Sequence, residues 1–233
     1  MQLTRLVLIR HGQTTWNTQG RLQGQLDIPL DALGRRQAAR LADALQDEGI
    51  SAVVSSDLSR AWDTALALAG PLGLPLRADP GLRERCFGVL QGRTRAQIDQ
   101  DTPELARRWH SREPDFAPEG AESLRAFSAR CLACVRRLAA EHSENAAQHA
   151  AQNAAQNAAQ HPAGSSLALV CHGGVLDSLY RAATHLALDA PRSWPLGNAV
   201  INRMLWTPQG LTLVGWNDAA HLDGIALDDP SEG

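Results

Sequence analysis

The chain has 233 residues, of which 44% are apolar, and its formal net charge is −3. This length and composition suit one α/β domain with a core large enough to need no disulfide support, and the charge does not indicate a nucleic-acid or membrane partner. No apolar run approaches the roughly 20 residues that span a bilayer, and the N-terminus lacks the apolar region of a signal peptide, so we expect a cytoplasmic protein.

Hydrophobic patterning along the chain predicts strands and helices in alternation. Strands are expected at 3–9, 51–55, 74–77 and 166–170, and a closing hairpin at 199–206 and 211–216. Helices are expected at 31–48, at 57–69 with Ser56 or Asp57 as the cap, at 94–112 with a break near Pro103, from about 121 onward, and from 173 to about 187. This alternation predicts an α/β fold in a single domain over residues 1–233, with a mostly parallel central sheet covered by helices on both faces.

Residues 145–160, NAAQHAAQNAAQNAAQ, are built from units of four residues. A period of four advances about 400° per unit along a helix, so no lasting apolar face forms. We interpret this Ala/Gln/Asn-rich segment as a tolerated insertion, either a projecting helix or a mobile loop.

Cys131 and Cys134 have the C-x-x-C spacing of half a zinc site or a redox pair. They fall, however, in an apolar stripe at helical spacing with Leu124, Phe127 and Leu138. No second pair of cysteines or histidines lies at ligand spacing, so we expect both to be small core residues.

Lysine is absent, and all 22 basic residues are arginine. This excludes a P-loop lysine, a Schiff-base lysine and a pyridoxal-phosphate lysine. An anion site in this chain must therefore use arginine, histidine, backbone N–H groups or a metal.

Nitrogen-rich side chains follow several predicted strands directly. Arg10 and His11 follow the first strand, Arg60 lies in the first turn after the second, and His172 follows the strand at 166–170. Ligands of open α/β sheets bind beyond the carboxyl ends of the strands, so these residues are expected to meet at one sheet edge, beside two helix N-termini. Such a site favours a phosphate or another anion.

At these residues the sequence resembles the histidine phosphatase superfamily, which includes the cofactor-dependent phosphoglycerate mutases. The matching segments occur in order along the chain: RHGQTTWNTQGRLQG (10–24), SSDLSRAWDTA (55–65), LRERCFGVLQG (82–92), PEGAESLRAFSAR (118–130) and VCHGG (170–174). The resemblance covers almost the whole chain outside the Ala/Gln/Asn-rich segment. It implies the three-layer α/β/α fold of that family.

The resemblance also implies residue roles. His11 would be the nucleophile that takes the phosphoryl group, Glu84 the proton donor to the leaving oxygen, and His172 the third catalytic residue, which binds the phosphoryl oxygens. Further contacts are implied for the phosphate from Arg10, Arg60 and Asn17, and for the rest of the substrate from Gln23 and Gly24. Glu84 lies between Arg83 and Arg85, which would lower its pKa if their side chains were close to it, whereas a general acid needs a raised one.

Two reactions begin with a phosphohistidine. A phosphatase admits water, whereas a mutase excludes water and returns the phosphoryl group to a different hydroxyl. The mutase pattern after the catalytic Glu is Arg-His-Tyr-Gly with a later lysine, and this chain has Arg85-Cys86-Phe87-Gly88 and no lysine. The mutase insertion is also short here, although Arg107-Arg108 could stand in for the paired arginines of mutases.

The preferred prediction is a metal-independent phosphomonoesterase that acts on a small phosphorylated metabolite without a cofactor. The alternative is a cofactor-dependent phosphoglycerate mutase. A non-catalytic phosphate binder is the third hypothesis, disfavoured because all the central residues are present.

Overall fold

A computed structural model describes residues 2–155 and 166–225. Within these residues one six-stranded sheet has the order β3-β2-β4-β1-β5-β6. Strands β1 to β4 pair in parallel, and β5 and β6 form an antiparallel hairpin beside β1, so the predicted mostly parallel sheet is confirmed. The strands are β1 Thr4–Arg10, β2 Ile50–Ser55, β3 Leu76–Ala78, β4 Ser166–Cys171, β5 Ile201–Thr207 and β6 Gly210–Asp218.

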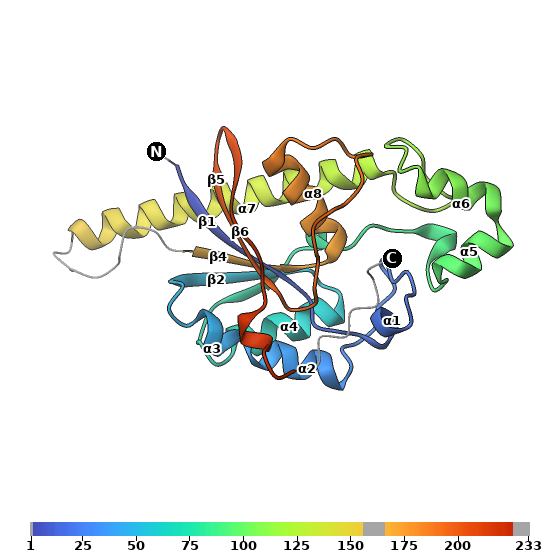
Figure 1. Ribbon diagram of the computed structural model, residues 1–233. Helices are drawn as coiled ribbons and strands as arrows, with labels where there is room; N and C mark the ends of the chain where they lie inside the picture. Colours follow the sequence, from blue (N-terminus) through green and yellow to red (C-terminus); the bar gives the residue numbers. More distant parts are fainter. Residues whose placement is uncertain (1, 156–165, 226–233) are drawn as a thin grey trace.

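Helices cover both faces of the sheet, as the predicted three-layer fold requires. In Figure 1, α2, α3 and α4 lie on one side of the strands, α7 and α8 lie on the other, and α5 and α6 lie together at one end. The helices are α1 Thr15–Thr18, α2 Ala32–Ala39, α3 Leu41–Leu45, α4 Ser59–Ala69, α5 Arg95–Asp101, α6 Pro103–His110, α7 Leu124–Ala155 and α8 Gly173–Thr184.

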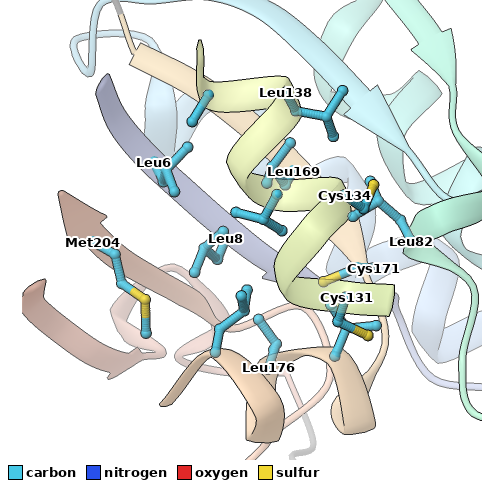
Figure 2. Close-up of a cluster of buried hydrophobic side chains, with 14 of the residues drawn as sticks. Leu6, Leu8, Leu82, Cys131, Cys134, Leu138, Leu169, Cys171, Leu176 and Met204 are labelled. Atoms are coloured by element: carbon cyan, nitrogen blue, oxygen red, sulfur yellow. The ribbon is translucent and has the colours of Figure 1, made fainter. Parts of the chain in front are cut away.

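The alternation of side chains along β1 divides the core into two layers. Leu6 and Leu8 pack toward α7 and α8, and Val7 and Ile9 pack toward α4. Figure 2 shows the first layer, in which Cys131 and Cys134 of α7 lie among leucine side chains. Both cysteines are free and buried, and burial raises the pKa of Cys134 to about 12, which confirms that they are core residues.

Several predicted boundaries differ from the structure. The helix expected over 31–48 is divided at Arg40, whose N–H turns back to the carbonyl of Gln37, and α3 ends at Leu45. The predicted cap of α4 by Ser56 or Asp57 is wrong. Leu58 is its N-cap residue, because the Asp57 carboxylate pairs with an arginine and the Ser56 hydroxyl lies against a histidine ring nitrogen.

Helix α7 continues into the Ala/Gln/Asn-rich segment as far as Ala155, so the first part of the insertion is helical. Figure 1 shows this end of α7 extending past the sheet, on the side away from α5 and α6. Residues 156–160 of the segment lie outside the described residues. No helix in the described ranges has the combination of length and hydropathy that a membrane span needs.

Candidate active site

Strand register places the two histidines side by side at the carboxyl edge of the sheet. Arg10 pairs with Cys171 across β1 and β4, and the His11 N–H continues this ladder with a 3.0 Å bond to the Cys171 carbonyl. His172 then caps α8 as its N-cap residue. The rings of His11 and His172 consequently lie 5.1 Å apart between centroids.

The His11 side chain is held in one tautomer. Its Nδ1 lies 2.7 Å from the Gly12 carbonyl oxygen, which can only accept, so Nδ1 carries the proton and Nε2 keeps a free lone pair. The turn is fixed in its place by a 3.0 Å bond from the Gly12 N–H to the Thr64 hydroxyl of α4. Gly12 also packs closely against Gly34 of α2. A Cβ on Gly12 would clash with the Gly34 backbone, and a Cβ on Gly34 would clash with the Gln13 backbone.

Burial and charge keep both histidines neutral. The pKa of His11 is held well below 6.5, first by desolvation and then by the positive charges of Arg60 and Arg10. The pKa of His172 is also held well below 6.5, first by desolvation and then by the positive charge of Arg60. A neutral imidazole with a free Nε2 is the form that can attack phosphorus.

These depressed values predict a loss of stability in mild acid. The unfolded chain protonates each histidine near pH 6.5, whereas the folded chain does not, so the unfolded state binds more protons below that pH. The free energy of unfolding should fall by up to about 1.4 kcal/mol per pH unit for each histidine as the pH drops below 6.5. Urea titrations at pH 7.5, 6.5 and 5.5 measure this slope, which His172→Gln should reduce. If the free energy of unfolding changed with pH as steeply in His172→Gln as in the wild type, the lowered pKa of His172 would be contradicted.

His172 lies against the His11 ring and is not among the residues that line the cavity described below. It is fully buried, and its Nε2 lies 2.9 Å from the Ser56 hydroxyl at the end of β2. Its predicted contact with the phosphoryl oxygens therefore stays a prediction, whereas its ring contacts the His11 ring.

Arg60 is completely buried and is one of the residues that line the cavity. Its Nη1 donates to the Leu26 carbonyl at 2.9 Å and its Nη2 to the Gly24 carbonyl at 2.7 Å. Burial lowers its pKa to about 10, which leaves it charged at neutral pH. Arg10 approaches the same space, and its Nη1 donates to the Leu196 carbonyl.

Asn17, Gln23 and Gly24 also line the cavity. The Asn17 amide oxygen accepts from the Thr14 N–H and hydroxyl, which closes the capping box of α1, so this residue has a structural task besides the predicted one. Asn198 lines the cavity too, and its Nδ2 donates to the His11 carbonyl at 2.9 Å. No local pattern in the sequence marks Asn198 as a site residue.

Glu84 faces the cavity with both carboxylate oxygens on backbone N–H groups. Oε1 accepts from Arg85 at 2.7 Å and Oε2 from Gly174, in the first turn of α8, at 3.0 Å. A Cβ at position 174 would meet Glu84 Oε1, so a larger residue there would displace the carboxylate. The flanking arginine side chains diverge: the Arg83 guanidinium pairs with Asp57, and the Arg85 Nε donates to the Glu122 carbonyl.

Gln91 stabilises the turn at Gly24 and Gln25, which contacts both Arg60 and Glu84. Its Oε1 accepts from the Gln25 N–H at 2.9 Å and packs against Gly24, which has a positive φ of 54°. Gly24 supplies the carbonyl that holds Arg60, and the Gln25 side chain donates to the Glu84 carbonyl at 3.2 Å. One amide oxygen thus fixes the turn on which two predicted active-site residues depend.

Gln91→Met should lower kcat/KM by about 10- to 100-fold, because the turn loses its acceptor and both groups shift from their positions. Gln91→Glu is the matched control, since a carboxylate oxygen accepts the same N–H bond. Steady-state phosphate release from both variants is the measurement. Equal losses in the two variants would mean that the hydrogen bond is not what matters.

The cavity has a volume of about 1210 Å³ and extends from His11 to the α5–α6 region. Its outer wall includes residues that the sequence did not single out as ligand contacts: Arg85, Phe87, Arg112 and Asp177. Arg107 and Arg108 do not line it. They are exposed and pair with Glu104 and Glu113 on α6 and the following loop.

Comparison with known proteins agrees with this geometry. The family model of the histidine phosphatase superfamily (branch 1) matches residues 6–151 and 143–219. A glucosyl-3-phosphoglycerate phosphatase of Mycobacterium tuberculosis is 38% identical over 89% of each chain, and a probable phosphoglycerate mutase GpmB of Yersinia pestis is 35% identical over 97% of this chain and 99% of its own. The solved structure of YhfR from Bacillus stearothermophilus has a TM-score of 0.79 and 27% identity, covering 94% of this chain and all of that one. The chain therefore belongs to the histidine phosphatase superfamily, branch 1.

Proposed function

We propose that the protein is a metal-independent phosphomonoesterase that hydrolyses a small phosphorylated metabolite through a phosphohistidine at His11. The observation that carries this proposal is the bond from His11 Nδ1 to the Gly12 carbonyl, which leaves Nε2 as a neutral nucleophile beside two guanidinium groups. The similarity to a phosphatase at 38% identity supports it.

The reaction has two steps. His11 Nε2 attacks phosphorus as the ester P–O bond breaks, and Glu84 gives its proton to the leaving oxygen. Water then attacks the phosphohistidine, the Glu84 carboxylate takes a proton from that water, and inorganic phosphate leaves with His11 neutral again. Arg10 and Arg60 stabilise the charge that spreads over the equatorial oxygens, which is where most catalysis of phosphoryl transfer arises.

Two observations favour hydrolysis over mutase chemistry. Arg107 and Arg108, the candidates for the paired mutase arginines, point away from the cavity into surface ion pairs. The cavity rim also includes the exposed residues Gln19 and Arg192, which leaves the predicted phosphohistidine within reach of water. A phosphoglycerate mutase is the second candidate, because a relative at 35% identity carries that probable name.

A panel of phosphate esters distinguishes the two candidates when it is scored for both released phosphate and isomerised product. Hydrolysis predicts phosphate release that is unaffected by chelators. A mutase would convert 3-phosphoglycerate to 2-phosphoglycerate with little release and would respond to 2,3-bisphosphoglycerate. Conversion without release would overturn the proposal.

A further inference from the structure

The backbone around Glu84 is held by two residues that the proposed mechanism does not use, Arg130 and Glu122. Glu84 lies in the irregular stretch between two short 3₁₀ helices, Pro80–Leu82 and Gly88–Leu90, so regular secondary structure does not fix its position. A general acid must stay within hydrogen-bond distance of the leaving oxygen, and a displacement of about 1 Å can cost about 10²-fold in rate. This stretch therefore needs support from elsewhere in the fold.

Arg130 of α7 bonds to three carbonyls of this stretch. Its Nη1 donates to the carbonyls of Gly81 and Arg83, each at 3.0 Å, and its Nη2 donates to the Glu84 carbonyl at 3.3 Å. Because the guanidinium is planar and rigid, these bonds together fix the direction in which the Glu84 side chain leaves the backbone. Helix α7 packs its apolar face against β1, so Arg130 ties the stretch to the central sheet.

Glu122, in the loop before α7, completes this arrangement. Its carboxylate accepts a bidentate pair of bonds from Arg130, from Nε to Oε1 and from Nη2 to Oε2, both at 2.8 Å. Oε2 also accepts the Cys86 N–H at 2.9 Å, and the Glu122 N–H donates to the Cys86 carbonyl at 3.0 Å. Bonds to ionised groups are stronger than neutral ones, so one ion pair fixes the chain both before and after Glu84.

The ion pair lies outside the cavity. Neither Arg130 nor Glu122 is among the residues that line it, and both side chains are about three-quarters buried. Burial raises the pKa of Glu122, but the bonds from Arg130 and from the Cys86 N–H outweigh this effect and hold the pKa below its ordinary value. The two residues can therefore influence the reaction through the groups they hold, and not by touching the substrate.

We propose that Arg130 and Glu122 are positioning residues for the predicted general acid, and that their ion pair holds the backbone on both sides of Glu84 so that its carboxyl group meets the leaving oxygen. This inference rests on the proposed phosphatase function and adds the contacts that orient its acid. Because the ion pair acts on the proton donor, its loss should slow an ester in proportion to the need of its leaving group for a proton.

Phenyl phosphate and p-nitrophenyl phosphate test this proposal, with the full-length enzyme in excess over the ester so that a single transfer to His11 is observed. The esters share one ring, but phenolate is the stronger base and needs the proton more than p-nitrophenolate does. Arg130→Lys keeps the charge and loses the planar fork that bonds to three carbonyls and a carboxylate. It should slow transfer from phenyl phosphate roughly tenfold more than from p-nitrophenyl phosphate, a part of the about 10²- to 10⁴-fold that acid catalysis supplies.

The ratio of the two rate constants does not depend on how much of a variant is folded. Arg125→Lys is the matched control, because Arg125 lies on the same helix and forms a bidentate pair with Asp115, at 2.6 and 2.9 Å, on the exposed surface. This variant should keep the wild-type ratio. Adding Arg130→Lys to Glu84→Gln should leave the ratio of the single Glu84→Gln variant unchanged, since the proton donor is already absent.

Several outcomes would overturn the positioning role. These are equal slowing of both esters by Arg130→Lys, an unchanged rate in that variant, a further change of the ratio when it is added to Glu84→Gln, or a ratio that Glu84→Gln itself does not alter. The proposed phosphatase function fails differently. It fails if the wild type transfers phosphate from neither ester, or if phosphate release persists in His11→Ala.

Discussion

His11→Ala is expected to abolish phosphate release, with a loss on the order of 10⁴-fold or more, because the variant lacks the predicted nucleophile that forms the covalent intermediate. We do not expect His172 to replace it, because the His172 side chain is fully buried and is not among the residues that line the cavity. Rapid-quench experiments with a ³²P-labelled ester should show a base-stable, acid-labile phosphoprotein in the wild type and none in the variant.

Free imidazole provides the control for this experiment. The alanine leaves a space that opens into the cavity, where Arg10 and Arg60 remain in place. Added imidazole should restore part of the phosphate release without labelling the protein. Wild-type rates in His11→Ala, or a labelled phosphoprotein in that variant, would show that the nucleophile lies elsewhere.

Glu84→Gln is expected to lower kcat by about 10²- to 10⁴-fold on alkyl phosphates, because the amide cannot give a proton to the leaving oxygen. The amide oxygen can accept only one of the two N–H bonds that the carboxylate accepts from Arg85 and Gly174, so part of the loss will come from a displaced side chain. Steady-state kinetics on alkyl and aryl phosphates is the measurement.

The aryl ester separates acid catalysis from positioning. p-Nitrophenolate leaves without a proton, so formation of the phosphohistidine from p-nitrophenyl phosphate should be much less impaired than from an alkyl phosphate. A burst of p-nitrophenol in Glu84→Gln would therefore support the general-acid role. Equal losses of burst rate on both esters would assign Glu84 a different task.

Much of the fold followed from local pattern. The apolar runs at β1 and β4, whose alternating side chains form two core layers, predicted the sheet and its carboxyl edge. That edge in turn predicted where Arg10, His11, Arg60 and His172 lie. Register then determined that the two histidines lie side by side, which no spacing in the sequence could show.

Other parts of the site depend on contacts between distant segments. The predicted cap of α4 is wrong because Asp57 binds Arg83, a pairing that forms only when the loop before Glu84 reaches the end of β2. Arg112 and Asp177 come together from the loop after α6 and from α8, and neither residue belongs to a motif. Contacts between segments that are distant in the sequence leave no local sequence pattern, so the outer wall of the cavity could not be predicted.

The backbone contact between Gly12 and Gly34 affects how the results of a mutational scan of this chain should be interpreted. Gly34 lies in α2, a helix that supplies no side chain to the predicted chemistry, yet any side chain there would push against the backbone of Gln13. Damage at position 34 would thus be transmitted to the nucleophile turn and would look like a catalytic defect. A scan scored by activity alone would therefore assign Gly34 to the active site, although it lies in a helix that supplies no side chain to the predicted chemistry.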